Sequence, residues 1–222
     1  MMKSSFFTLI SKEFLAEWRQ RYALNGMLLY IISTIFVCYL SFNIKNTDLQ
    51  SVTWNALFWI IILFTSINSI AKSFIQENEG RLLYYYSLAS PQHIILSKIV
   101  YYGTIMTILS FAGYFFYSFV MGNPIQDLTM FALVVLLASF GLSSALTMLS
   151  GIASKAPNST SLIAILSFPV LLPLLLVIIK ASKNAMDGIN RSLYIDDILL
   201  LVAINAIIVA VSYMLFPYLW RS

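Results

Sequence analysis

Long apolar runs separated by short polar stretches make up most of this chain. Six runs are about 20 residues long, the length that an α-helix needs to cross the roughly 30 Å hydrocarbon layer of a bilayer. They cover residues 23–42, 52–71, 99–120, 128–151, 160–179 and 198–217. They lack the period-two alternation that is typical of membrane β-barrels. The pattern therefore predicts an all-α membrane protein, with six transmembrane helices in a single domain over residues 1–222.

An amphipathic stretch precedes the first run. Aromatic and aliphatic residues recur there at intervals of three and four, which is the spacing of one helical face. They are Phe7, Ile10, Phe14, Trp18 and Tyr22, while Lys12, Glu13, Arg19 and Gln20 fall on other faces. We therefore expect residues 1–22 to form an interface helix at the cytoplasmic membrane surface. Two roles remain open for it: a topological anchor, or a lever that contacts a partner.

Composition supports a membrane protein. The chain is 60% hydrophobic and 10% charged, whereas soluble domains average about 45–50% and about 25%. The net charge of +4 arises from basic residues scattered singly beside apolar runs, which indicates membrane orientation rather than nucleic-acid binding. Cys38 is the one cysteine, so no internal disulfide can form.

Lysine and arginine favour the cytoplasmic side of a membrane. With the N-terminus inside, nine basic residues would lie in the cytoplasm and four outside. The inner set is Lys3, Lys12, Arg19, Arg21, Lys72, Arg81, Lys98, Lys155 and Arg221, and the outer set is Lys45, Lys180, Lys183 and Arg191. This distribution predicts that both termini are cytoplasmic. The outer connection 180–197 is the exception, because it holds three basic residues, and it is a candidate for a short surface helix.

Two runs carry features that affect helix packing. In the fourth, small residues recur every four positions: Ser139, Ser143, Thr147 and Gly151. Such a stripe lets another helix approach closely, either within the chain or in a second copy. In the fifth, Pro169 and Pro173 each lack a backbone donor and should bend the helix. The bend is interpreted either as a fixed kink or as a hinge.

Motifs for nucleotide or metal chemistry are missing. The sequence has no G-x-x-x-x-G-K-[ST] loop, no H-E-x-x-H spacing and a single histidine, His93. No charged residue falls in the middle third of any run, where ion-coupled carriers commonly need one. The polar residues Asn55, Asn68 and Asn205 fit interhelical hydrogen bonding. We therefore expect a non-enzyme without a directly bound cofactor or metal.

The segment QENEGRLLYYYSLASPQH, residues 76–93, lies between the second and third runs. Glu77 and Arg81 are four apart with the acid first, which is a favourable helical pair. Leu82, Leu83 and Tyr86 gather on another side. Ser90 fits an N-cap and Pro91 the first position of the next helix. The segment is interpreted as a solvated loop or as a short amphipathic helix that docks a soluble partner.

Three motifs, in order along the chain, carry a family resemblance. They are ENEGRLLYYYSLASP with Lys98 following, SSALTMLSGIASK, and SFPVLLPLLLVIIKAS with its paired prolines. With the length of 222 residues, they resemble the permease subunits of type-2 ABC exporters. Within that group they are similar to the cytochrome c maturation protein B family, also called haem exporter protein B. The chain departs from that family at Tyr84–Tyr86, where aliphatic residues are expected, and this leaves the details of docking open.

The resemblance implies a cytoplasmic coupling helix between spans two and three. In it Glu77, Glu79, Gly80, Arg81, Leu82 and Leu83 would transmit motion from a separate cytoplasmic ATPase, so ATP would act through that partner. The resemblance also implies two copies in a complex of the bacterial inner membrane. Other haem-handling membrane subunits would belong to it, with haem as the substrate. Pro169 and Pro173 would let the fifth span flex.

The implied function is permease work in cytochrome c maturation, either haem export or release of a haem-loaded chaperone. Two other hypotheses remain. One is a membrane scaffold of the maturation complex that transports nothing. The other is an unrelated small-solute channel or carrier, which the lack of charge at membrane depth disfavours.

Overall fold

A computed structural model describes residues 2–19, 22–43, 49–71, 73–74, 90–156, 159–193 and 195–221. Within these ranges the chain is helical and contains no strand. The elements are α1 (Met2–Arg19), α2 (Tyr22–Asn43), α3 (Ser51–Ile70), α5 (Pro91–Met121), α6 (Leu128–Ala153), α7 (Ser159–Met186), the 3₁₀ helix η1 (Arg191–Leu193) and α8 (Ile195–Arg221). Six of them, all except α1 and η1, are long and apolar enough to cross a membrane. The predicted all-α fold with six transmembrane helices is therefore confirmed.

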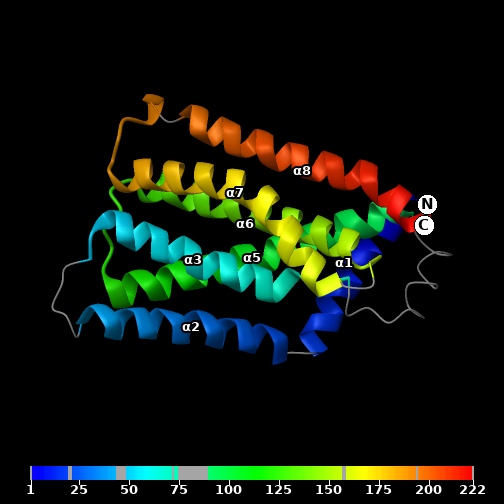
Figure 1. The fold of residues 1–222 in the computed structure, drawn as a ribbon, viewed down its shortest axis with the longest axis horizontal. Helices are drawn as coiled ribbons and strands as arrows, with labels where there is room; N and C mark the ends of the chain where they lie inside the picture. Colours follow the sequence, from blue (N-terminus) through cyan, green and yellow to red (C-terminus); the bar gives the residue numbers. More distant parts are fainter. Residues whose placement is uncertain are drawn as a thin grey trace.

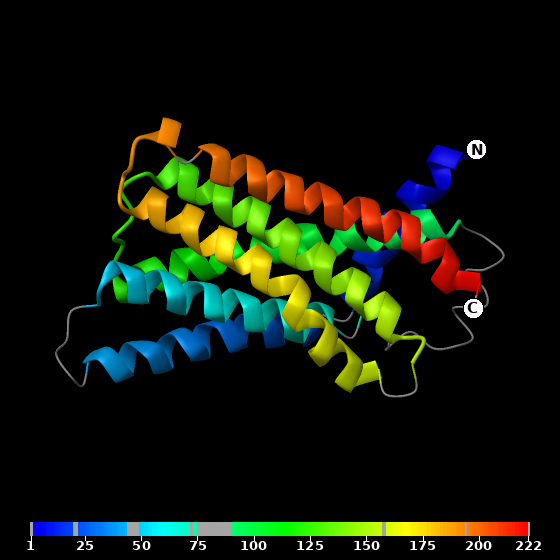
Figure 2. The ribbon, with the colours of Figure 1, turned by 45° about the horizontal axis from the view of Figure 1, so that its top comes forward.

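The six long helices lie side by side and run alternately in opposite directions (Figures 1 and 2). Helix α1 and both chain ends lie at one end of this bundle, together with the C-terminal ends of α3 and α6. We call this the α1 end, and the opposite end, which carries η1, the η1 end. Each successive span therefore crosses the bundle, as a multi-pass membrane protein requires.

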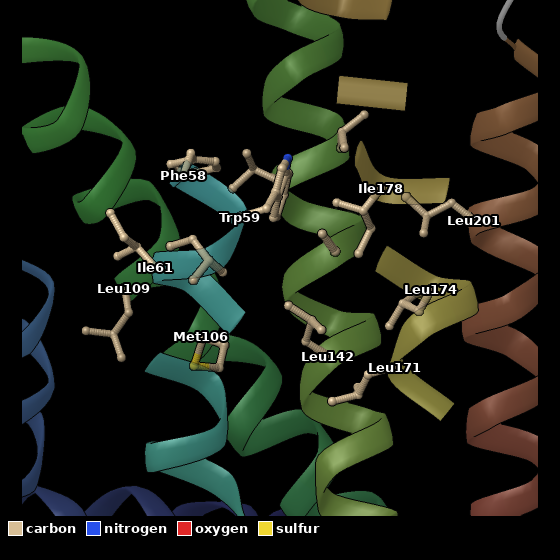
Figure 3. Close-up of a cluster of buried hydrophobic side chains, with 14 of the residues drawn as sticks. Phe58, Trp59, Ile61, Met106, Leu109, Leu142, Leu171, Leu174, Ile178 and Leu201 are labelled. Atoms are coloured by element: carbon tan, nitrogen blue, oxygen red, sulfur yellow. The ribbon is translucent and has the colours of Figure 1, made fainter. Parts of the chain in front are cut away.

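Helix α6 lies at the centre of the bundle and packs against α5, α7 and α8. The core around it is built from aliphatic and aromatic side chains of facing helices (Figure 3). Leu142 of α6, Leu174 of α7 and Leu201 of α8 are all completely buried. Large apolar residues also cover the outer faces, for example Phe36 of α2, Phe168 of α7 and Ile207 of α8. A bilayer, rather than water, is the solvent that such an outer surface fits.

Helix bounds differ from the predicted spans where a helix continues beyond the apolar run. Helix α5 begins at Pro91, the first helical position that the sequence predicted, ahead of the apolar run 99–120, whereas α7 continues to Met186 instead of ending at 179. Ser90 occupies the N-cap position as predicted, but its hydroxyl contacts His93 Nδ1 at 2.9 Å and caps no backbone N–H. Hydropathy marks where lipid is tolerated, whereas backbone hydrogen bonding decides where a helix ends.

Two predicted elements have different outcomes. Helix α1 forms over Met2–Arg19, close to the predicted 1–22, and its place at the membrane surface stays a prediction. The coupling helix falls in residues 75–89, which lie outside the described residues. Glu77, Glu79, Gly80, Arg81, Leu82 and Leu83 all belong to that range.

Candidate functional site

Helix α7 contains both prolines of the fifth apolar run. Pro169 and Pro173 lie inside the helix and lack the N–H groups that would bond to the carbonyls four residues earlier. The axis of α7 changes direction along its length, and its N-terminal half leans across α3 (Figures 1 and 2). The paired prolines are the local cause of a bend, since each removes one backbone hydrogen bond, in two successive turns of the helix.

Residues 163–175 of α7, which span both prolines, and the C-terminal half of α3 line a groove of about 560 Å³. We call it the α3/α7 groove. Its walls are mostly aliphatic, and Phe64 and Phe168 expose about half or more of their side chains beside it. An apolar wall with a few polar groups is typical of small-molecule sites. The groove can therefore accept an apolar or amphiphilic molecule from the bilayer.

Two polar side chains line this groove, one from each helix. Asn68 of α3 is exposed there. Ser167 of α7 is 6% exposed, and its hydroxyl has no hydrogen-bond partner among the described residues. A buried hydroxyl left without a partner costs about 1–3 kcal/mol. A ligand with a hydrogen-bonding group could recover part of that free energy.

Beyond the groove, toward the η1 end, α3 and α7 are joined by a chain of hydrogen bonds. The indole N–H of Trp59 donates to Ser182 Oγ at 2.8 Å, and the Ser182 hydroxyl is 2.9 Å from Asn55 Oδ1. Asn55 Nδ2 then donates to the carbonyl of Ile179 at 3.1 Å. The C-terminal part of α7 is therefore anchored to α3, while the groove is lined by residues 163–175, on both sides of the prolines.

The three asparagines of the apolar runs have different roles. Asn55 makes the interhelical bond just described, and Asn205 of α8 donates to the carbonyl of Leu137 in α6 at 2.9 Å. The expectation of interhelical hydrogen bonding is confirmed for these two. Asn68 lines the α3/α7 groove instead. Sequence spacing could not separate the cases, because it does not show which helix faces meet.

The stripe of small residues in α6 faces the interior of the chain. Ser139, Ser143, Thr147 and Gly151 are all buried. The Ser139 hydroxyl is 2.9 Å from Ser110 Oγ in α5. A Cβ on Gly151 would lie 3.0 Å from the ring of Phe216 in α8. The stripe thus borders helices of its own chain.

Gly141 is a packing residue that sequence reasoning missed. A Cβ at this position would overlap the amide oxygen of Asn205 and lie 3.1 Å from Leu174 Cδ1. Gly141 therefore lets α6 contact both α7 and α8 closely. The available signal was a glycine inside an apolar run, which often marks a close helix contact.

At the η1 end, each described basic residue is paired with an aspartate. Arg191 of η1 donates to both oxygens of Asp127, at 2.7 and 2.9 Å, and Asp127 also caps α6 by accepting from the Met130 N–H. Lys180 pairs with Asp197 at 2.8 Å, and Lys183 pairs with Asp187. The basic residues of the 180–197 connection are thus tied to neighbouring helix ends.

These observations define a multi-pass, all-helical membrane protein with a bent span beside an apolar groove. Comparison with family models matches residues 4–176 to the ABC-2 type transporter family. The chain therefore belongs to the ABC-2 type transporter family. Comparison with curated proteins gives no match.

Membership fixes the general role of the chain. It is the membrane permease of an ABC transporter, and permeases of this family work with a cytoplasmic ATPase partner. The predicted resemblance to type-2 ABC exporters is confirmed at this level.

Proposed function

We propose that this permease acts in cytochrome c maturation. It couples ATP hydrolysis by a separate subunit to haem export, or to release of a haem-loaded chaperone. The main support for a transport role of this chain is the α3/α7 groove, which lies beside the proline-containing part of α7. The haem assignment is supported by the three motifs in residues 77–91, 143–155 and 167–182, which resemble the cytochrome c maturation protein B family.

In this proposal α7 has one fixed and one moving half. The Trp59–Ser182–Asn55 bonds hold the η1-end half against α3. Pro169 and Pro173 weaken the backbone ladder between the two halves. Motion from the ATPase enters through Glu77, Glu79, Gly80, Arg81, Leu82 and Leu83. It then bends α7 at the prolines and changes the width of the α3/α7 groove.

The groove would hold haem through the macrocycle. Its aliphatic walls and Phe64 and Phe168 offer apolar contact, and Ser167 and Asn68 offer hydrogen bonds. A planar, largely apolar molecule fits this mixture. Haem is in this view a transported substrate and no resident cofactor.

We propose the bacterial inner membrane as the location, with the α1 end in the cytoplasm. The α1 end carries six described basic residues, namely Lys3, Lys12, Arg19, Lys98, Lys155 and Arg221, against three at the η1 end. This asymmetry follows the positive-inside rule. Two copies pair in the complex, and haem-handling membrane subunits are its further partners.

Purification with the co-expressed ATPase, in lipid nanodiscs, tests the proposal. Haem, or haem-loaded chaperone, should stimulate ATP hydrolysis by the complex. The double variant Glu77→Lys/Glu79→Lys should still insert into the membrane but lose ATPase capture. Asp187→Lys/Asp196→Lys makes the same charge change at the η1 end and should retain capture.

Three results would contradict the proposal. Normal ATPase capture by the Glu77→Lys/Glu79→Lys variant would show that this segment does not couple the permease to the ATPase. Normal cytochrome c assembly with an ATPase-dead partner would favour the scaffold hypothesis. Solute flux from the purified chain alone would favour a channel or carrier.

A further inference from the structure

Lys98 of α5 is a buried lysine at the α1 end, with 2% of its surface exposed. Its ammonium lies 3.8 Å from Glu13 Oε1 of α1 and 3.4 Å from the carbonyl oxygen of Ser73. It also lies 4.8 Å from the ring centroid of Phe74. Burying an ammonium costs several kcal/mol unless partners compensate. Lys98 therefore joins α1 and the residues that follow α3, two parts of the chain far apart in sequence.

Phe74 also contacts α6 and α8. Its backbone N–H donates to Ser150 Oγ of α6 at 3.1 Å. Its ring packs against Phe216 of α8 with centroids 5.2 Å apart, and Gly151 leaves the space for both rings. Phe74 is 2% exposed. A displacement of this residue must therefore displace α6 or α8, because close-packed side chains leave no free space to absorb it.

Helix α1 is held to α5 by a second contact one turn further along. Phe14 of α1 meets Tyr101 of α5 edge to face, with centroids 5.0 Å apart. Glu13 and Phe14 are adjacent in α1, and Lys98 and Tyr101 are three apart in α5, so the two contacts act side by side. A displacement of α5 near Lys98 should therefore displace α1 as well.

We infer that Lys98 and Phe74 form a mechanical joint, which passes displacement of the chain beyond residue 74 to α1, α6 and α8. This inference rests on the proposed function, in which an ATPase moves that part of the chain. Phe74 transmits to α6 and α8 through Ser150 and Phe216, and Lys98 transmits to α1 through Glu13. A methionine could fill the volume of Lys98 without a desolvation cost. The ammonium alone ties a carboxylate, a carbonyl and a ring into one unit. Lys98 and Phe74 are positioning residues.

The test measures nucleotide-driven movement in the complex with the co-expressed ATPase. Spin labels at exposed Ser11 of α1 and Tyr218 of α8, on a Cys38→Ser background, report the distance between these helices with and without ATP. The wild-type chain should show a change in this distance. Lys98→Met should capture the ATPase normally but lose the change, and substrate-stimulated hydrolysis should fall by about fivefold or more. Lys98→Arg, which keeps the charge, should restore both.

A second variant keeps the test decisive if Lys98→Met does not fold. Glu13→Gln removes the carboxylate from a less buried position and should reduce the movement of α1 with the ATPase still bound. Combining Glu13→Gln with Lys98→Met should add little further loss, because both remove the same link. If folded Lys98→Met and Glu13→Gln complexes keep the wild-type, ATP-dependent change in distance, the joint is overturned and the proposed function stays intact. Failure of the wild-type chain to capture an ATPase would instead overturn the proposed function, and the joint with it.

Discussion

Trp59 and Ser182, 123 positions apart in sequence, meet at 2.8 Å through the indole N–H and the serine oxygen. Both side chains are buried, and the same serine lies 2.9 Å from Asn55 Oδ1. The contact fixes the η1-end half of α7 on α3. It therefore sets the boundary between the anchored part of α7 and the part beside the groove.

Removing the central amide of this network should destabilise the fold. Asn55→Ala deletes the bond to the Ile179 carbonyl and leaves the Ser182 hydroxyl with one partner fewer. We expect a loss of about 0.6–2 kcal/mol, the range found for hydrogen bonds between membrane helices. Thermal unfolding in detergent measures it. Asn68→Ala, on the exposed groove wall, is the control and should leave the midpoint nearly unchanged. Equal shifts in the two variants would contradict the assignment.

Gly141 should tolerate no side chain. Gly141→Ala would place a methyl group against the Asn205 amide and Leu174. Overpacking of this kind costs about 1–3 kcal/mol. Gly26→Ala in α2 is the matched control, because no described residue packs within 4 Å of a Cβ built there. Alanine should at that position stabilise the helix by up to about 1 kcal/mol. The same unfolding assay should move the two midpoints in opposite directions. A neutral Gly141→Ala would show that α6 and α8 can separate at little cost.

The two prolines of α7 should affect transport more than stability. Pro169→Ala/Pro173→Ala restores two backbone donors, so stability should be kept or raised while α7 becomes stiffer. We expect substrate-stimulated ATP hydrolysis to fall by about tenfold, equivalent to about 1.4 kcal/mol of lost coupling. Pro217→Ala in α8, also inside a helix but away from the groove, should keep normal coupling. Retained coupling in the double variant would favour a fixed kink over a hinge.

The partners of the Arg191–Asp127 pair should contribute unequally. Asp127→Ala loses the N-cap of α6 as well as the ion pair, and the cap alone is worth about 1 kcal/mol. Arg191→Ala loses the pair but keeps the N-cap of α6, and 55% of the Arg191 side chain is exposed. Solvent screening therefore limits its cost to about 1 kcal/mol or less.

Thermal unfolding at low and high salt separates the two contributions. The stability difference between wild type and Arg191→Ala should shrink as salt rises, because ions screen an exposed pair. The larger part of the Asp127→Ala effect should persist, because a cap hydrogen bond is short-ranged. If Asp127→Ala and Arg191→Ala lowered stability equally at every salt concentration, the capping role of Asp127 would be contradicted.

Local patterns were enough to predict the six spans. Each span is a run of about 20 apolar residues, and in lipid such a run must satisfy its own backbone hydrogen bonds as a helix. Pro91 likewise marked the start of α5, because proline is tolerated at a first helical position. The paired prolines predicted a weakened α7 for the same local reason. These features depend on neighbours in the sequence, so the sequence alone carries them.

The groove, the hydrogen-bond chain and the buried lysine depend on residues far apart in sequence. Ser167 and Asn68 share a groove only because the proline-containing part of α7 lies beside α3. Lys98 is buried because α1 and Phe74 close around it, whereas the sequence indicated only a basic residue on the cytoplasmic side. The sequence by itself determined which segments are helices that cross the membrane. Only the tertiary structure decided which polar groups meet, because a lipid-facing and a helix-facing position look equally apolar along the chain.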